Sequence, residues 1–336
     1  MPSPLAPILR AAEGAVLHAR LQVEDRRAGA QLRLVQDRRA GLGPRDIILV
    51  ACLRNEAFRM EAFAEHYRRL GVRRFLLVDN ASDDGFMDWA AAQPDVSVWH
   101  TTGSYKASNF GMRWCNELLR RHGIGRWCVC VDPDEFLVYP HSETRDLRAL
   151  ADFLDEEKRA SLHCLMLDAY ADRPLADAVL APGANPFAVC PFFDRDGYVQ
   201  SGGWGSGTTI QGGPRMRTHF RDAPEQSPAL NKIPFVKWQW HYHYRSSMHD
   251  GWPWRMNRVP GPQAITGALF HFKFVSTLRD KAAEEMKRGQ HYAGSREYAR
   301  YHEDASGAFF VEGISVRYEG TDQLARLGLI NPGRWF

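Results

Sequence analysis

Residues 46–53, DIILVACL, form an almost continuous apolar run, the pattern of a strand buried on both faces of a parallel sheet. The runs RRFLLVD at 73–79 and WCVCV at 127–131 repeat this pattern. Between the runs, apolar residues such as Phe63 and Tyr67 recur at helical spacing. Strands that alternate with helices predict an α/β fold with a parallel sheet, whose ligands bind at the carboxyl ends of the strands. The predicted strands are 46–53, 73–79, 96–99, 127–131 and 163–168, and the predicted helices are 56–70, 108–121 and 146–158.

The composition is that of a globular protein with enough apolar material for a large core. The chain has 336 residues, of which 44% are hydrophobic, and 43 Lys+Arg nearly balance 40 Asp+Glu. Disordered and fibrous classes are therefore excluded, and a net charge of +3 provides no strong field for nucleic acid. The six cysteines show no zinc-site spacing, and no run resembles a signal peptide or a membrane span. We expect a cytoplasmic enzyme that does not bind nucleic acid.

The chain divides into four segments by composition. Residues 1–45 form an Arg-rich extension, 46–140 carry the regular strand and helix pattern, 141–275 are less regular, and 276–336 return to helical spacing before a short tail. The extension has two interpretations, a solvated helix packed on the body or a basic helix that contacts the inner membrane surface or a partner. The aromatic-rich loops within 171–262 also have two, an irregular subdomain or a carbohydrate-binding surface.

The strongest chemical motif is VDPDEF, which follows the buried run that ends at Val131. Asp132 and Asp134 leave the sheet one residue apart, so both carboxylates can face one hard cation. Mg²⁺ and Mn²⁺ are held by one or two carboxylates together with phosphate oxygens of the substrate. The alternative is a solvated acidic turn in which Pro133 only sets the bend. We expect the motif to bind a metal.

Polar residues also follow the other two long apolar runs. Arg54, Asn55 and Glu56 come directly after the first, and Asp79 ends the second. An acid at a strand tip can accept hydrogen bonds from a ribose or from a base, although an Asx-turn is the ordinary alternative. Because parallel strands end at the same edge of a sheet, these side chains are expected to lie near Asp132.

Three motifs in order, ILVACLRNE, VDNASDDG and VDPDEF, resemble the nucleotide-binding half of family 2-like glycosyltransferases with the GT-A fold. The segment KASNFG at 106–111 is similar to the segment before the family's donor-site helix, with Ser108 as its predicted N-cap. NKIPFVKW, GALFHFKF and EEMKRGQHYAGSREYARY are similar to a bacterial group related to the DUF23-type transferases. The resemblance covers about 47–301 and implies a Rossmann-like sheet with a loop-rich acceptor subdomain.

The resemblance also implies a role for each matching residue. It makes 46–140 the donor half and 141–275 the acceptor half, with VDPDEF as the DXD motif. Metal ligands would be Asp132, Asp134 and His271, although His271 could instead be a core histidine between two phenylalanines. Donor contacts would come from Arg54, Asn55, Glu56, Asp79, Lys106, Asn109 and Asp132, and phosphate attraction from Lys273, Lys281 and Arg288 unless these only solvate a helix.

The catalytic base is the point at which this chain departs from the family pattern. An inverting transferase needs a base for the acceptor hydroxyl, and the usual acidic pair after the DXD motif is missing. Asp250 and His249 are the preferred candidates, and Asp168 at the end of HCLMLD is the third. Each of them could instead be a structural hydrogen-bonding residue.

The sequence therefore predicts a metal-dependent glycosyltransferase, of the inverting type, that uses Mn²⁺ or Mg²⁺. It would transfer a sugar from a nucleoside diphosphate donor, expected to be UDP-linked, to a hydroxyl group of a glycan or a related acceptor. Two other classes stay open. One is an aspartyl-phosphate phosphatase with Asp132 as nucleophile and Asp134 as acid. The other is a protein that binds a nucleotide or carbohydrate without turnover.

Overall fold

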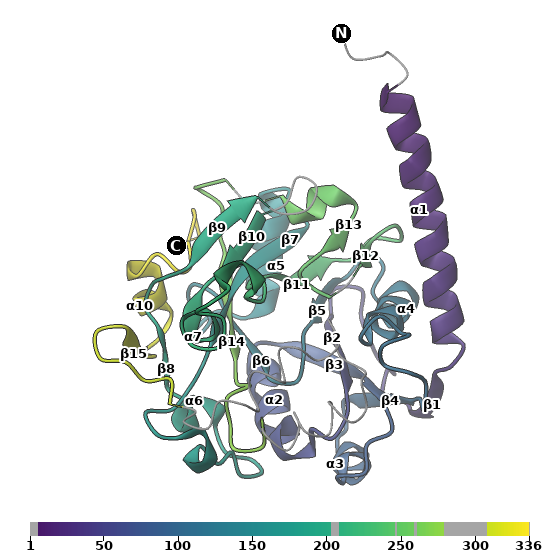
Figure 1. Ribbon diagram of the computed structural model, residues 1–336. Helices are drawn as coiled ribbons and strands as arrows, with labels where there is room; N and C mark the ends of the chain where they lie inside the picture. Colours follow the sequence, from purple (N-terminus) through teal and green to yellow (C-terminus); the bar gives the residue numbers. More distant parts are fainter. Residues whose placement is uncertain (1–5, 203–207, 246, 259–260, 279–307, 336) are drawn as a thin grey trace.

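The computed structural model describes residues 6–202, 208–245, 247–258, 261–278 and 308–335. A nine-stranded mixed sheet with helices on both faces forms its centre, and its strand order is β1-β4-β3-β2-β5-β11-β7-β14-β6 (Figure 1). The strands of this sheet are β1 (Arg33–Gln36), β2 (Ile47–Leu53), β3 (Val72–Asp79), β4 (Val96–His100), β5 (Trp127–Cys130), β6 (Glu135–Val138), β7 (Ser161–Asp168), β11 (Asn231–Lys237) and β14 (Gly267–His271).

Strands β2, β3, β4, β5, β7 and β14 run in one direction, while β1, β6 and β11 run in the other. Numbered along the chain from β2, the first four parallel strands have the order 3-2-1-4, as in doubly wound nucleotide-binding folds. The order reverses between β2 and β5. In open α/β sheets, the crevice at the carboxyl ends of the strands on either side of this switch point is where ligands bind.

Helices cover both faces of the sheet because its central strand β2 is apolar at every position and needs cover on each side. Ile48 and Val50 of β2 pack with α4 (Met112–His122), whereas Leu49 and Ala51 face the opposite side. On that side they join a core that contains residues of α2 (Ala57–Arg69), α3 (Phe86–Ala91) and α5 (Leu147–Glu156).

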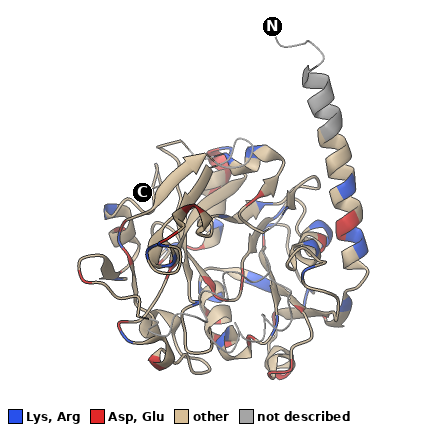
Figure 2. Cartoon of the chain, viewed as in Figure 1, with Lys and Arg blue, Asp and Glu red and all other residues tan. Residues whose placement is uncertain are grey.

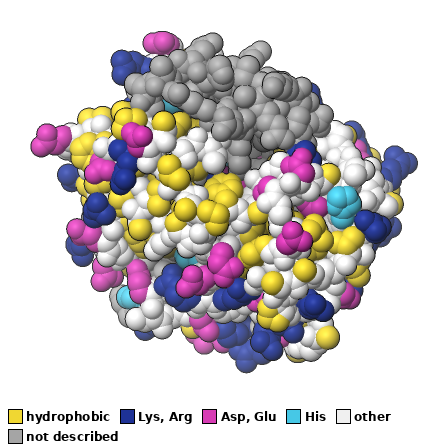
Figure 3. Space-filling model, turned by 90° about the horizontal axis from the view of Figure 1, so that it is seen from below, with side chains coloured by type: hydrophobic (Ala, Val, Ile, Leu, Met, Phe, Trp, Pro, Cys, Tyr) yellow, Lys and Arg dark blue, Asp and Glu magenta, His cyan; other side chains and the backbone are white. Residues whose placement is uncertain are grey.

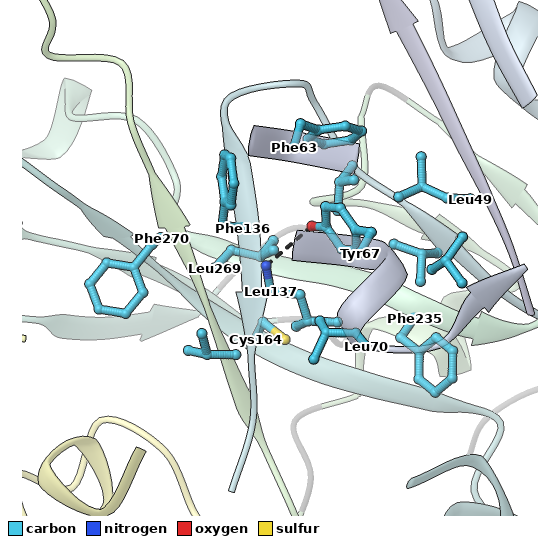
Figure 4. Packing of buried hydrophobic residues seen from close by; sticks show 14 of the residues in the cluster. Leu49, Phe63, Tyr67, Leu70, Phe136, Leu137, Cys164, Phe235, Leu269 and Phe270 are labelled. Atoms are coloured by element: carbon cyan, nitrogen blue, oxygen red, sulfur yellow. Dashed lines mark hydrogen bonds between the residues drawn. The ribbon is translucent and has the colours of Figure 1, made fainter. Parts of the chain in front are cut away.

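Tyr67 fixes the strand that follows the acidic motif. Its hydroxyl donates to the carbonyl oxygen of Glu135 at 2.8 Å and accepts from the backbone nitrogen of Leu137 at 3.1 Å. The ring packs within the main core beside Phe63 and Phe136 (Figure 4). Tyr67 therefore fixes the first three residues of β6, Glu135 to Leu137. This also fixes the turn with Asp132 and Asp134 that precedes the strand.

The N-terminal helix α1 (Ala6–Gly29) extends beyond the rest of the molecule (Figure 1). Residues 14–29 of this helix carry charges of both signs (Figure 2). Two contacts hold its C-terminal half, an ion pair of 2.8 Å between Glu24 and Arg113 and a contact of 2.7 Å between Oδ2 of Asp25 and Nδ1 of His243. No helix in the described part of the chain is both long enough and apolar enough to cross a bilayer.

The remaining elements come mainly from the loop-rich region. They are η1 (Leu175–Asp177), α6 (Pro186–Val189), β8 (Phe192–Asp194), β9 (Val199–Gly202), β10 (Thr208–Gln211), α7 (Gly213–Arg217), η2 (Pro224–Gln226), β12 (His243–Tyr244), β13 (Gly251–Trp252), η3 (Trp254–Asn257), β15 (Ser315–Arg317) and α10 (Thr321–Arg326). Seen from below, the described side chains of both charges are interspersed with hydrophobic ones (Figure 3).

The predicted strands and helices are confirmed with small shifts of their bounds, and the expected α/β class is correct. Strands from 46–140 and from 141–275 share one sheet. The predicted N-cap at Ser108 is wrong. The helix begins three residues later after Gly111, whose φ of 78° suits glycine, and the Ser108 hydroxyl donates to the Tyr105 carbonyl oxygen. Most of the helix expected from residue 276, with Lys281 and Arg288, lies outside the described residues.

Candidate active site

The acidic motif lies at the switch point, directly after β5. The backbone nitrogen of Glu135 donates to the carbonyl oxygen of Asp132 at 3.0 Å, which closes a tight turn around Pro133 and Asp134. The nitrogen of Phe272 donates to the carbonyl oxygen of Asp134 at 2.8 Å and thereby joins this turn to the end of β14. The side chain of Asp132 is 44% exposed and that of Asp134 is 21% exposed. Both carboxylates are therefore accessible at this edge.

His271 faces Asp134 and is held from behind by Asp168. Its Nε2 lies 3.3 Å from a carboxylate oxygen of Asp134, and its Nδ1 lies 2.7 Å from Oδ1 of Asp168. The other oxygen of Asp168 accepts from Nε of Arg215 at 2.7 Å. Asp168 ends β7 and His271 ends β14, and the two residues pair directly in the parallel ladder. The strand register thus builds the chain Asp134–His271–Asp168–Arg215.

The neighbouring charges favour the ionised forms of His271 and Asp168. Burial alone would lower the pKa of His271, but the carboxylates of Asp134 and Asp168 outweigh it and raise that pKa to about 9. Burial would raise the pKa of Asp168, but the charge of Arg215 and the contact with His271 lower it. The site is therefore a place where positive charge is stabilised beside Asp134.

Lys232 supplies a buried cation on the other side of the motif. Its Nζ lies 3.1 Å from Oδ2 of Asp132 and also donates to the carboxylate of Glu135. Burial would lower the pKa of Lys232, but the two carboxylates outweigh it and raise the pKa, so the ammonium is charged. Burial raises the pKa of Glu135 to about 7 against the opposing effect of Lys232.

The loops after β2 and β3 are joined into one unit at the same edge. The guanidinium of Arg54 donates to the carbonyl oxygens of Asn80 and Ala81, the Asn80 bond being 2.9 Å long. The side-chain oxygen of Asn55 accepts from the nitrogen of Asp83 at 3.0 Å. Asn55 and Ala81 have φ values of 53° and 57°, a region that non-glycine residues rarely occupy. Such conformations cluster at binding sites.

Two acids of this edge are occupied by partners within the chain. Asp79 is fully buried, and its oxygens accept from the nitrogen of Ser82 at 2.9 Å and contact Nδ1 of His100 at 2.7 Å. Glu56 pairs with the buried Arg59 at 2.7 Å. A donor contact by either carboxylate requires that these bonds be shared or exchanged.

Residues 106–111, the segment before α4, also lie near the carboxyl edge of the sheet. Asn109, whose φ is 56°, donates through its side-chain nitrogen to the carbonyl oxygen of Arg245. Lys106 lies in the same segment and is exposed. Since β11 is antiparallel to β5 and β7, its first residue, Asn231, lies at the carboxyl edge of the sheet and contacts His249. The predicted donor segment and the predicted base region therefore lie near one another.

The three candidates for the base differ in availability. Both oxygens of Asp168 are engaged and its side chain is fully buried, so it orients His271. Nδ1 of His249 contacts the carbonyl oxygen of Asn231 at 2.6 Å, and burial together with the charge of Lys232 lowers its pKa to about 3. Asp250 is partly exposed beside Arg245, and burial raises its pKa. Of the three, only Asp250 combines exposure with a raised pKa, which suits a general base.

A divalent cation fits beside Asp134 by the chemistry of the donors. Among the described residues no group of three or more His, Cys, Asp or Glu is arranged to hold a metal. Mg²⁺ and Mn²⁺ sites on nucleotides need fewer protein ligands, because phosphate oxygens and water complete the shell. Nε2 of His271 and the Asp134 carboxylate converge, and Asp168 contacts Nδ1 and so fixes the orientation of the imidazole ring. A bound cation would replace the proton on Nε2.

Sequence reasoning missed Lys232 and Arg215, two buried cations of this site. Lys232 carried a signal, because it stands alone between Asn231 and the apolar run Ile233–Val236. A charged side chain in a buried strand is rarely without a partner of opposite charge. Arg215 comes from the irregular segment before Thr218, where no periodicity indicates which side chain faces the sheet.

Comparisons with known proteins leave the family open. No protein-family model and no curated protein matches the chain. Among solved structures, a putative glucose-1-phosphate thymidylyltransferase from Bacillus anthracis, in complex with a sucrose, aligns with 84% of this chain and 93% of its own. The TM-score is 0.30 and the sequence identity is 8%. A likeness this distant carries no argument about activity.

Proposed function

We propose that this protein is a metal-dependent glycosyltransferase of GT-A architecture that uses a nucleoside diphosphate sugar, with UDP as the expected nucleotide. The observation that carries the proposal is the chain Asp134–His271–Asp168–Arg215 beside Asp132 at the switch point of the sheet. Exposed carboxylates at this place would repel a diphosphate, and a bound cation removes the repulsion.

The proposed roles follow from the contacts of each residue. Asp134 and His271 would hold Mn²⁺ or Mg²⁺, which as a Lewis acid neutralises the charge that develops on the leaving diphosphate. Asp168 would orient the imidazole of His271, which it contacts at 2.7 Å, and Arg215 holds Asp168 in place through an ion pair of the same length. The side chain of Asp132 is partly exposed and is held by Lys232, so its free face can contact the bound donor.

The loops around the edge would bind the rest of the donor. Arg54 and Asn55 fix the β2 and β3 loops against each other, which presents backbone groups to a ribose or base. Lys106 would contribute charge toward the phosphates. Asp250 would accept the proton of the acceptor hydroxyl, because a carboxyl with a raised pKa is a better base than one at its ordinary value.

Hydrolysis of UDP-sugars without an acceptor is the test of this proposal. We expect Mn²⁺-dependent release of UDP from at least one sugar donor, and a loss of about 100-fold or more in Asp134→Asn, as is typical when charge stabilisation in the transition state is removed. The matched control is Asp155→Asn, which removes a surface carboxylate that pairs with Lys237. Metal-independent release, or equal activity in Asp134→Asn, would contradict the proposal.

One contact favours a second candidate, a phosphatase that forms an aspartyl-phosphate. Lys232 lies 3.1 Å from Asp132, and a lysine beside a carboxylate nucleophile can neutralise an incoming phosphate. The measurement that separates the two functions is release of phosphate from p-nitrophenyl phosphate with Mg²⁺. A phosphatase turns this ester over and loses activity in Asp132→Asn, whereas a glycosyltransferase leaves it intact.

A further inference from the structure

A cavity lies between the β9–β10 hairpin, the first half of β7 and the beginning of β14. Its volume is about 400 Å³, within the range of about 300–1,000 Å³ typical of small-molecule sites. His163 and Leu165 of β7 and Gly267 of β14 line one side, and Leu329 near the C-terminus lines another. Segments far apart in the sequence thus converge on one space, and Asp132, Asp134, Asp168 and His271 are not among its lining residues.

The β9–β10 hairpin forms one wall of this cavity with one face only. Gln200 pairs with Ile210 across the hairpin, and both line the cavity, as do Tyr198 and Thr208 at alternate positions. Val199 and Thr209 alternate with them and are not among the lining residues. Because side chains alternate across a strand, the hairpin has an inner face with these four residues and an outer face.

The interior of the cavity carries no net charge at neutral pH. Its charged residues, Arg195 and Asp196, lie 3.7 Å apart, and both side chains are about half exposed or more. The histidines are neutral, since burial lowers the pKa of His163 to about 4 and that of His249 to about 3. Since Arg195 already pairs with Asp196, a phosphate or carboxylate ligand would lose hydration here with little compensating charge, which disfavours it relative to a neutral ligand.

The remaining lining suits a ligand with hydroxyl groups on apolar rings. The side chains of Gln200 and Thr208 show no hydrogen bond to any described residue, and the Thr266 hydroxyl accepts from the nitrogen of Asn331 and keeps its proton to donate. Leu165 and Leu329 add aliphatic surface. A neutral sugar offers both kinds of surface, hydroxyl groups at its rim and C–H groups on its faces.

We propose that this cavity, between the inner face of the β9–β10 hairpin and the beginnings of β7 and β14, binds an uncharged saccharide unit. The inference rests on the proposed function and deepens it, because His249 and Asn257 line the cavity and adjoin Asp250, the proposed base, while none of the proposed metal ligands lines it. It would let the protein hold one sugar of a glycan while another part of the glycan reacts elsewhere.

The test is binding of neutral sugars to the full chain without nucleotide and with EDTA present. Methyl glycosides of glucose, galactose, mannose and N-acetylglucosamine, together with maltose and lactose, are titrated by calorimetry and saturation-transfer NMR. Glucose 6-phosphate and uridine are the charged and the nucleoside comparisons. We expect saturable binding of at least one neutral sugar and none of the other two probes.

Two pairs of variants locate the site. Ile210→Trp fills the cavity from the inner face, while Thr209→Trp adds the same side chain to the outer face. We expect at least a tenfold loss of affinity in the first and no change in the second. Gln200→Leu, with Ser201→Ala as its outer-face control, gives the same comparison if Ile210→Trp does not fold.

Three results would overturn the inference. They are no saturable binding of any neutral sugar in the millimolar range, stronger binding of glucose 6-phosphate or uridine, and equal loss in the inner-face and outer-face variants. Each leaves the proposed function standing, because Asp134→Asn and not the hairpin tests that function. Conversely, sugar binding that persists in Asp134→Asn supports the cavity even if donor hydrolysis fails.

Discussion

Asp168 contacts Nδ1 of His271 at 2.7 Å, and Asp25 contacts Nδ1 of His243 at the same distance. All four residues are buried. The two pairs differ in their second neighbours. Arg215 lies on Asp168 and Asp134 on His271, whereas Nε2 of His243 lies 3.3 Å from Nδ1 of another histidine, that of residue 18.

The second neighbours decide what each pair does. Two carboxylates raise the pKa of His271 to about 9, and burial, opposed by Arg215 and His271, leaves the pKa of Asp168 lowered. Around Asp25 burial outweighs the contact with His243 and raises the pKa of the carboxyl. In the first pair the charged form of Asp168 is stabilised behind the partly exposed Asp134, whereas in the second pair, which fastens α1 to the body, burial disfavours the charged form of Asp25.

The largest effect on stability is expected at the ionic pair. Asp168→Asn leaves the guanidinium of Arg215 buried without its carboxylate, which costs about 3–5 kcal/mol when one member of a buried pair is removed. Urea unfolding at pH 7, followed by circular dichroism, measures the change. A loss below about 1 kcal/mol would show that the pair is not a buried ion pair.

A smaller loss is expected at the pair of Asp25 and His243. Asp25→Asn keeps an oxygen that accepts from Nδ1 of His243, and it removes a charge that burial already disfavours. We expect about 1 kcal/mol or less, the ordinary value of one hydrogen bond. The same urea experiment applies, and a loss equal to that of Asp168→Asn would erase the distinction between the two pairs.

A third histidine, His66, sharpens the comparison, because no carboxylate of a described residue is paired with it. Nε2 of His66 donates to the carbonyl oxygen of Leu137 at 2.9 Å, and burial lowers its pKa to about 3. The unfolded chain takes up this proton near pH 6.5 and the folded one near pH 3, so the stability that neutral His66 provides is fully present above pH 6.5 and is lost as the pH falls.

At pH 5 the expected loss relative to pH 7 is about 2 kcal/mol from this residue, at 1.36 kcal/mol per pH unit. His66→Gln keeps a side-chain donor for the Leu137 carbonyl and does not titrate. The free energy of unfolding of this variant should fall less between pH 7 and pH 5 than that of the parent chain. Identical slopes would mean that His66 is not buried as a neutral group.

The α/β fold could be predicted because its central strands are apolar runs in the sequence. The side chains of β2, β3 and β5 are apolar on both faces of the sheet over most of their length. Because the three strands are parallel, the polar residues that follow them lie at one edge. The pairing of Asp168 with His271 was not predicted, because residues 267–271 were not among the predicted strands and their place beside β7 is set by the order of the sheet. What the two side chains would contact depends on Arg215, which no strand or helix pattern positions.

Other parts of the site were beyond pattern reasoning for related reasons. Asp79 was expected to face a ligand, but Ser82 and His100 occupy its oxygens, a result of loop geometry that apolar periodicity does not encode. Lys232 becomes interpretable only when β11 is known to run antiparallel beside β5. The donor-contact role of Asp79 and the base role of Asp250 stay predictions.

Calorimetric titration of UDP into the full chain, with Mn²⁺ and then with EDTA, tests the central claim most directly. If Asp134 and His271 hold a cation for the diphosphate, UDP binds at least tenfold more tightly with Mn²⁺, and Asp134→Asn removes the difference. If UDP binds equally well with Mn²⁺ and with EDTA, and other nucleoside diphosphates do the same, the chain is not the metal-dependent transferase proposed.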